Sequence, residues 1–274
     1  MPSETTRGRT RSELALRLAS AAVLIPFALC VVYFGGVPLA VGCAIFAGVM
    51  GLEWAGMSRS SLRMPLALAC ALPSVIAGTV SLEAGALCVL ATSGLMGVLA
   101  FGSPVRMGEA VFGVLYAGGM PLALFVLRDG PWDGLPAALI FMSIVWASDA
   151  AAYFAGKGFG GPRLSPRESP NKTWSGAIGA VISTALCGAI AAYLTGGDRV
   201  GWIVTGILIS VVAQGGDLFE SQIKRRFGVK DAGGILPGHG GIMDRVDGLG
   251  AVCAITVLVF IVVPASLDLL GLNT

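Results

Sequence analysis

The segment EAVFGVLYAGGMPLALFVLR, residues 109–128, decides the fold class of this 274-residue chain. Eighteen residues without a charge lie between Glu109 and Arg128, and a membrane-spanning helix needs about 20 mostly apolar residues. Similar runs fill most of the chain, which is 55% hydrophobic and 12% charged, whereas a soluble domain has about 25% charged residues. The composition predicts an all-α, polytopic integral membrane protein and argues against a disordered or nucleic-acid-binding chain.

About nine transmembrane helices are expected. The run at 14–35 is longer than a signal-peptide core and no clear cleavage site follows it, so we interpret it as a retained first span. The hinge at 81–84 is short, which leaves counts of eight or ten open. The predicted spans are 13–35, 37–57, 64–81, 84–102, 109–128, 134–156, 174–196, 200–222 and 248–270.

Basic residues are distributed unequally between the two sides of these spans. Sixteen of the eighteen Lys and Arg residues fall on one side, and the exceptions are Arg128 and Arg199. Cytoplasmic loops carry an excess of Lys and Arg. We therefore expect a cytoplasmic N-terminus, and nine spans would put the C-terminus outside.

The six cysteines all lie within apolar runs, and none forms a C-x-x-C pair or adjoins the single histidine. Free cysteine behaves as a small buried hydrophobe. The pattern favours packing roles over a disulfide framework or a zinc site.

Ionisable residues gather in the last two cytoplasmic loops, whereas the first five spans carry almost none inside them. We divide the chain into an N-terminal transmembrane bundle, residues 1–130, for packing, lipid access and self-association, and a C-terminal catalytic region, residues 131–274, with two cytoplasmic polar loops. A transporter would place ionisable groups near the midplane of several spans, so the distribution argues against transport.

The first polar cluster is WASDAAAYFAGKGFGG, residues 146–161. Asp149 and Tyr153 are four residues apart and share a helix face, and an aspartate inside a span is a functional-site hypothesis by default. The glycines at 156–161 predict a flexible loop around Lys157 that could approach an anion. The spacing is not that of a phosphate-binding P-loop, and a plain glycine-rich helix exit is the alternative.

The second cluster is SPNKTWSG, residues 169–176. The Ser-Pro pair indicates a turn, and Thr173 is suited to cap the following helix. Asn171 and Lys172 are candidates to contact a phosphate or a sugar. An ordinary capped helix start is the alternative.

The third cluster is QGGDLFESQIKRRFGVKDAGGILPGHGGIMDRVDG, residues 214–248. A helix at 214–224 places Gln214, Asp217, Ser221 and Lys224 on one face, with Glu220 beside them. Magnesium takes one or two carboxylates and completes its shell with water and substrate phosphate. Asp217 and Asp244, brought together from two span ends, fit that description.

Basic residues in the third cluster are candidates to hold phosphates. Lysine and arginine beside a span also contact lipid headgroups and set topology, and we favour that interpretation for Arg226. For His239 a turn-stabilising or metal-shell role is as plausible as a general base. The candidate phosphate ligands are Lys224, Arg225, Arg226 and Lys230.

The third cluster resembles the phosphatidate cytidylyltransferase family, also called CDP-diacylglycerol synthases. The family signature is S-x-x-K-R-x4-K-D-x4-[LIF]-P-x-H-G-G-x-x-D-R-x-D, and the resemblance extends upstream through D-x-x-A-Y-x-x-G-K and S-P-N-K-T-W. Ser175 stands where the family usually has Glu, so no role for that Glu carries over. The matching positions are Ser221, Lys224, Arg225, Lys230, Asp231, Leu236, Pro237, His239, Gly240, Gly241, Asp244, Arg245 and Asp247.

The resemblance implies a reaction in phospholipid biosynthesis, in which CMP passes from CTP to phosphatidic acid and pyrophosphate is released. It implies Mg²⁺ at Asp217 and Asp244, with a second cation nearby, and an active site facing the cytoplasm from a multi-pass protein of the inner (plasma) membrane. Expected partners are CTP, phosphatidic acid, membrane lipid and a second copy of the chain, with no nucleic acid. The expected catalytic residues are Asp217, Asp244, Lys224, Asp247 and Ser221, and the expected substrate-binding residues are Lys157, Asn171, Lys172, Arg225, Lys230, His239, Arg245, Tyr153 and Asp149.

A lipid or polyprenol kinase is the main alternative, because the same metal and phosphate groups would serve phosphoryl transfer. The products separate the two activities, since a cytidylyltransferase places cytidine on the lipid.

Overall fold

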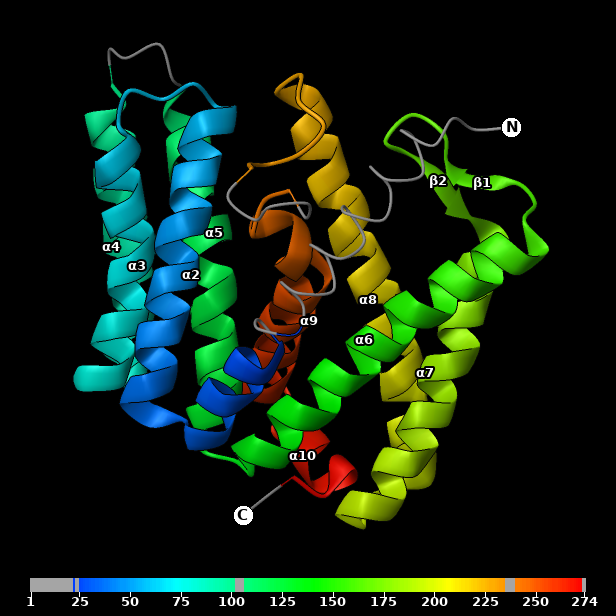
Figure 1. Ribbon diagram of the computed structural model, residues 1–274. Coiled ribbons are helices and arrows are strands. Elements are labelled where there is room, and N and C mark those ends of the chain that lie inside the picture. Colours follow the sequence, from blue (N-terminus) through cyan, green and yellow to red (C-terminus); the bar gives the residue numbers. More distant parts are fainter. Residues whose placement is uncertain (1–21, 23–24, 102–105, 235–239, 273–274) are drawn as a thin grey trace.

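The computed structural model describes residues 22, 25–101, 106–234 and 240–272, which form a bundle of long helices with one short β hairpin (Figure 1). A first helical stretch, Ile25–Phe34, precedes α2. The hairpin pairs β1 and β2 in antiparallel fashion, with Arg163 opposite Thr173. The elements are α2 (Gly36–Met57), α3 (Arg63–Thr79), α4 (Leu82–Leu99), α5 (Met107–Asp129), α6 (Gly134–Phe159), β1 (Arg163–Ser165), β2 (Ser169–Thr173), α7 (Trp174–Thr195), α8 (Arg199–Arg226), α9 (Met243–Val262) and α10 (Ala265–Leu270).

Seven helices in the described part of the chain are long and apolar enough to cross a membrane: α2, α4, α5, α6, α7, α8 and α9. Helix α3 has 17 residues and is shorter, and most of the predicted first span before Ile25–Phe34 lies outside the described residues. The all-α, polytopic membrane fold is confirmed. The count of nine stays a prediction.

The predicted hinge at 81–84 coincides with a turn and the beginning of α4, between two helices that pack against each other. Helix α3 ends at Thr79, and the hydroxyl of Ser81 accepts a hydrogen bond from the backbone N–H of Ala84 at the start of α4. A serine in this position satisfies one of the unpaired N–H groups of the first turn. The chain therefore forms two separate helices here.

The predicted last span, 248–270, is wrong at both ends. Helix α9 begins earlier, at Met243, and ends at Val262, after which α10 is a separate short helix. Proline disfavours the α conformation of the residue before it, and Val263, which precedes Pro264, has φ −128° and ψ 71°. The earlier start places Asp244 and Asp247 inside the first turns of α9.

The predicted flexible loop around Lys157 is also wrong, because α6 continues to Phe159. Positive φ angles begin only at Gly160 and Gly161. A Cβ on Gly156 would lie 2.9 Å from the hydroxyl of Thr173, so this glycine serves close packing against the start of α7. The predicted turn at 169–170 is instead the beginning of β2.

Helix α9 lies between two groups of helices, with α2–α5 on one side and α6–α8 on the other (Figure 1). It packs against α5 and against α8. Met243, at its beginning, is fully buried in the same apolar cluster as Met50 and Trp54 of α2. The N-terminal turn of α9 is therefore held by both halves of the chain.

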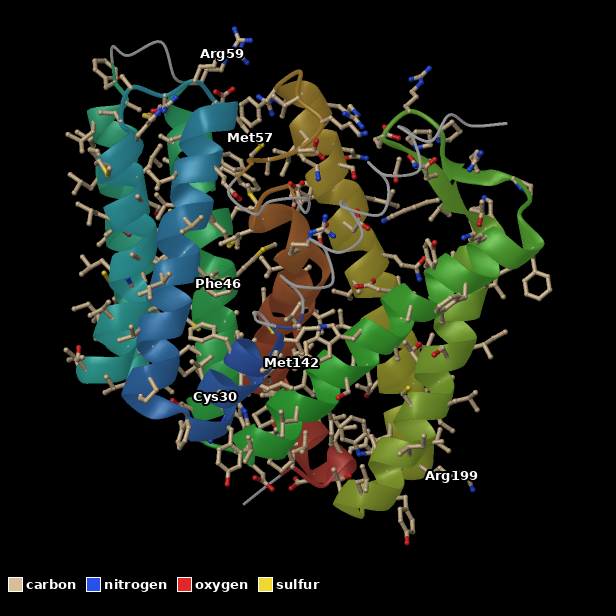
Figure 2. All side chains as sticks on the ribbon, in the orientation of Figure 1. Cys30, Phe46, Met57, Arg59, Met142 and Arg199 are labelled. Carbon is tan, nitrogen blue, oxygen red and sulfur yellow. The ribbon has the colours of Figure 1, made fainter. Side chains whose placement is uncertain are left out.

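The β hairpin, the α2–α3 connection, the ends of α4 and α8 and the beginning of α5 lie at one end of the bundle (Figure 1). Arg59 lies at this end and Arg199 at the opposite end (Figure 2). Arg59, which the sequence assigned to the more basic side, thus lies at the opposite end from Arg199, one of the two exceptions.

Candidate active site

The site is built where the end of α8 meets the beginning of α9. The ammonium group of Lys224 donates a hydrogen bond to Asp244 Oδ1 at 2.5 Å. Asp244 Oδ2 accepts two backbone hydrogen bonds, from Ala232 and Gly241, each at 2.9 Å. Three donors thus fix the direction of this carboxylate, and charged partners make such bonds stronger than neutral ones.

Glu220 lies one helical turn before Lys224 on α8, and it is fully buried. Its Oε1 accepts a hydrogen bond from Lys224 at 3.2 Å, and its Oε2 accepts one from the hydroxyl of Tyr116 on α5 at 3.3 Å. A buried charge is costly unless it is paired and hydrogen-bonded. Lys224 therefore bridges two carboxylates, one from its own helix and one from α9.

The β hairpin closes a second side of the site. Lys172 on β2 forms an ion pair with Asp217 on α8 at 2.5 Å. Asp149, on α6, interacts electrostatically with both of them. The structure thus joins three elements that the sequence analysis treated as separate clusters.

Asp247 lies one turn beyond Asp244 on α9 and interacts electrostatically with Glu220 and Asp217. Its carboxylate accepts a hydrogen bond from the N–H of Gly248 at 2.8 Å. Asp247 is thus close enough to Glu220 and Asp217 for the three carboxyl groups to repel one another when charged.

The cluster carries more carboxyl than ammonium groups. Five carboxyl groups face two lysines: Asp149, Asp217, Glu220, Asp244 and Asp247 against Lys172 and Lys224. Within the described residues no three His, Cys, Asp or Glu side chains already form a metal-ligand group. Magnesium needs only one or two carboxylates when phosphate and water complete its shell, so this oxygen-rich donor set fits Mg²⁺ bound together with a nucleotide.

Ser221 follows Glu220 on α8, and the residue is 8% exposed. Its neighbours on the predicted face, Gln214, Asp217 and Lys224, are helical as expected. Gln214 donates a hydrogen bond to Ser210 at 3.0 Å, and Ser210 in turn bonds with Ser148 of α6. This polar contact ties α8 to α6 about two helical turns before Asp217.

Several predicted residues lie apart from this cluster. Lys157 contacts the hydroxyl of Tyr153 at 3.4 Å, and the side chain of Tyr153 is largely exposed. Arg225 donates a hydrogen bond to the carbonyl of Val229. Asn171 and Lys230 are exposed. His239 lies outside the described residues.

Arg245 lies in the first turn of α9, directly after Asp244. It borders an apolar cavity of about 190 Å³, which is also lined by Phe46 and Met142, labelled in Figure 2, and by Leu249. A phosphate contact for Arg245 stays a prediction.

Two residues next to the site were not predicted. Glu53, on α2, accepts hydrogen bonds from the backbone of Ile242 and Met243, and Tyr116, on α5, contacts Glu220. A glutamate near a span end has no local sequence pattern that distinguishes a buried carboxylate from an exposed one. The only signal was that Glu53 is one of the few ionisable residues in the first five spans.

The site is thus a cluster of lysines and carboxylates at the ends of packed, apolar helices, as expected of a membrane-embedded enzyme. A family model described as "Cytidylyltransferase family" matches residues 15–263. The chain belongs to the cytidylyltransferase family, which confirms the expected resemblance, and it is a nucleotidyltransferase.

Curated relatives carry one common name. The chain is 37% identical over 263 residues to the phosphatidate cytidylyltransferase of Brucella suis biovar 1, covering 90% of this chain and 93% of that protein. It is 39% identical over 141 residues to the phosphatidate cytidylyltransferase of Haemophilus influenzae, covering 49% of each. The Rickettsia felis protein of the same name is 35% identical over 119 residues, covering 40% of this chain and 52% of that protein.

Proposed function

We propose that this enzyme transfers CMP from CTP to phosphatidic acid, giving CDP-diacylglycerol and pyrophosphate for phospholipid biosynthesis. The observation that carries the proposal is the Lys224–Asp244 pair between α8 and α9, which lies in the segment that matches the family signature. The shared name of the curated relatives supports the same substrates.

The reaction forms one phosphoanhydride bond and breaks another. An oxygen of the lipid phosphate attacks the α-phosphorus of CTP, and the bond from the α-phosphorus to the bridging oxygen breaks, so that pyrophosphate leaves with that electron pair. The lipid phosphate is already anionic at neutral pH and needs no strong general base. Phosphoryl transfer depends mainly on positioning and charge neutralisation, which lysines and oriented carboxylates supply.

In this proposal Lys224 and Lys172 neutralise phosphate charge from two sides of the site. Asp217 and Asp244 would hold Mg²⁺ once a nucleotide supplies further oxygen ligands. Bound Mg²⁺ would polarise the phosphate oxygens and neutralise the charge of the leaving group. Both aspartates are paired with lysines in the structure, so these lysines must share the carboxylates or turn toward the substrate when nucleotide binds.

Other parts of the site have supporting roles. Ser221 and Asp247 orient the lysine–carboxylate cluster, and Asp149 completes its wall on the hairpin side. The residues away from the cluster remain proposed substrate contacts, and a second cation remains part of the proposal. These residues are Tyr153, Lys157, Asn171, Arg225, Lys230, His239 and Arg245.

The end of the bundle with most of the basic residues is proposed to face the cytoplasm, where CTP is available. The unequal distribution of Lys and Arg supports this orientation, and placement in the inner membrane follows from the proposed reaction. Residues 1–130 are proposed to provide packing, lipid access and a homodimer contact for the catalytic region, residues 131–274.

A direct assay tests the proposed function. Purified protein is incubated with phosphatidic acid in mixed micelles and with CTP, dCTP or ATP, with Mg²⁺ or with EDTA, and pyrophosphate is measured. The proposal predicts pyrophosphate release that needs a cytidine nucleotide, phosphatidic acid and Mg²⁺ together. Release that is independent of the lipid, or supported by ATP alone, would contradict it.

A further inference from the structure

Glu53 is a buried carboxylate from the N-terminal half of the chain that contacts the beginning of α9. It lies near the end of α2, and the residue is 4% exposed. Its Oε1 accepts a hydrogen bond from the backbone N–H of Ile242 at 2.8 Å, and its Oε2 accepts one from that of Met243 at 2.9 Å. One side chain thus satisfies two successive backbone donors of a distant helix.

Helix α9 needs such an external acceptor. The first N–H groups of an α-helix have no partner within the helix and are usually satisfied by a nearby Ser, Thr, Asp or Asn. The N-cap of α9 is Ile242, which has no polar side chain and makes no capping hydrogen bond. A negative charge is also favourable at the positive end of the helix dipole. Glu53 therefore replaces the missing local cap.

The loop before α9 is shaped around the same carboxylate. A Cβ added to Gly233 would lie 2.7 Å from Oε1 of Glu53, and one added to Gly241 would lie 2.8 Å from both carboxylate oxygens. Side chains at these positions would displace the carboxylate or the loop. The two glycines thus leave space for Glu53 at two points of the α8–α9 connection.

The backbone that Glu53 contacts lies directly before Asp244 of the candidate active site. Met243 directly precedes Asp244, and Gly241 donates its N–H to Asp244 Oδ2 at 2.9 Å. Fixing the backbone at 241–243 fixes the direction of the Asp244 carboxylate, whose other oxygen contacts Lys224. Any rotation of this first turn would move Asp244 relative to Lys224.

We propose that Glu53 is a positioning residue for the reaction, which holds the first turn of α9 so that Asp244 faces Lys224 and the nucleotide. The inference rests on the proposed role of Asp244. It gives the N-terminal half a part in building the site, beyond packing and lipid access. A 1 Å misplacement of a reacting group can cost about a hundredfold in rate, so a remote cap can control turnover.

The test compares Glu53→Gln with two further variants. Glutamine has nearly the same shape but only one oxygen acceptor, so one of the two backbone donors loses its partner. Glu53→Asp keeps the charge on a shorter side chain. Glu109→Gln is the matched control, because Glu109 is also a glutamate at this end of the N-terminal bundle, and its carboxylate pairs with the exposed Arg226 at 3.6 Å.

The first readout is hydrogen–deuterium exchange of the peptide at 240–247 in detergent-solubilised protein. Glu53→Gln is expected to speed exchange at the amides of Ile242 and Met243 at least tenfold, whereas Glu109→Gln leaves them unchanged. This arm does not depend on which reaction the enzyme catalyses. Wild-type exchange rates in Glu53→Gln would overturn the capping contact itself.

The second readout is kinetic, with each rate normalised to folded protein. Glu53→Gln is expected to lower kcat at least tenfold and to raise the Mg²⁺ concentration for half-maximal rate, because Asp244 is no longer held. Glu53→Asp should fall between this variant and the wild type. Unchanged kcat and Mg²⁺ dependence per folded molecule, even with a lower melting temperature, would show that Glu53 only stabilises the fold and would overturn the positioning role.

The two proposals fail in different ways. If the wild-type protein makes no CDP-diacylglycerol, the proposed function fails, while the exchange experiment still reports on the Glu53 contact. If the wild type is active and Glu53→Gln is equally active, only the positioning role fails.

Discussion

The ammonium group of Lys172 lies 2.5 Å from the carboxylate of Asp217, which joins the β hairpin to α8. The side chain of Lys172 retains 24% of its exposure and that of Asp217 40%. The carboxylate side of the pair is therefore partly open to solvent, whereas the ammonium nitrogen of Lys172 is itself buried. This contact places the segment SPNKTWSG beside α8 at the candidate site.

Replacing Lys172 by alanine should lower kcat/KM for CTP at least tenfold, because the proposed site loses one of its two lysines and Asp217 loses its partner. Arg167→Ala is the control, since Arg167 is an exposed cation in the same hairpin. Steady-state kinetics with varied CTP measures both. If the two variants were equally active, Lys172 would have no specific role with the nucleotide.

Asp217→Asn and Asp244→Asn should each abolish Mg²⁺-dependent formation of CDP-diacylglycerol while the folded protein remains in the membrane. Each change removes a negative charge from the proposed metal pair. Asp133→Asn is the control, because Asp133 is an exposed aspartate at the opposite end of the bundle. Near-normal turnover in either site variant would remove that residue from the metal assignment.

Gly206→Ala should destabilise the protein through the contact between α7 and α8. A Cβ at Gly206 would overlap the carbonyl of Thr184, and overpacking of this kind costs about 1–3 kcal/mol. Gly215→Ala, on the same helix, is the matched comparison because nothing lies within 4 Å of its Cβ position. Thermal melting in detergent should show a clear decrease for Gly206→Ala alone, and equal melting temperatures would refute this packing argument.

The proposed orientation predicts which end of the bundle a membrane-impermeant maleimide reaches. In a cysteine-free background, Arg167→Cys in the hairpin should react only when the cytoplasmic face is accessible, as in inverted vesicles. Asp133→Cys, before α6, should react in intact spheroplasts. The opposite pattern would reverse the topology and contradict a cytoplasmic active site.

Apolar runs and caps were the most predictable features of the fold. Helix α7, Trp174–Thr195, matches the predicted span 174–196, and Thr173 caps it through the N–H of Gly176, as expected. Errors arose at glycines and prolines, because the same residue type can serve two different structural roles. The glycine at 156 was interpreted as a source of flexibility, but it serves close helix packing, and Pro264 divided the predicted last span.

The candidate site was predictable to the extent that its residues share one helix face or one motif. Asp217 and Lys224 lie on α8 at helical spacing, and Asp244 follows in the same signature. The contacts of Glu53 and Tyr116 connect residues about a hundred or more positions apart. Such contacts depend on how the two halves pack, which hydropathy and local spacing do not encode.

The most direct test of the central claim is the fate of the label when the purified protein receives phosphatidic acid and CTP labelled at either the α- or the γ-phosphorus. The account predicts that the α-label enters the chloroform-soluble lipid together with cytidine, while the γ-label appears in pyrophosphate. Transfer of the γ-label to the lipid would identify a lipid kinase and contradict cytidylyl transfer.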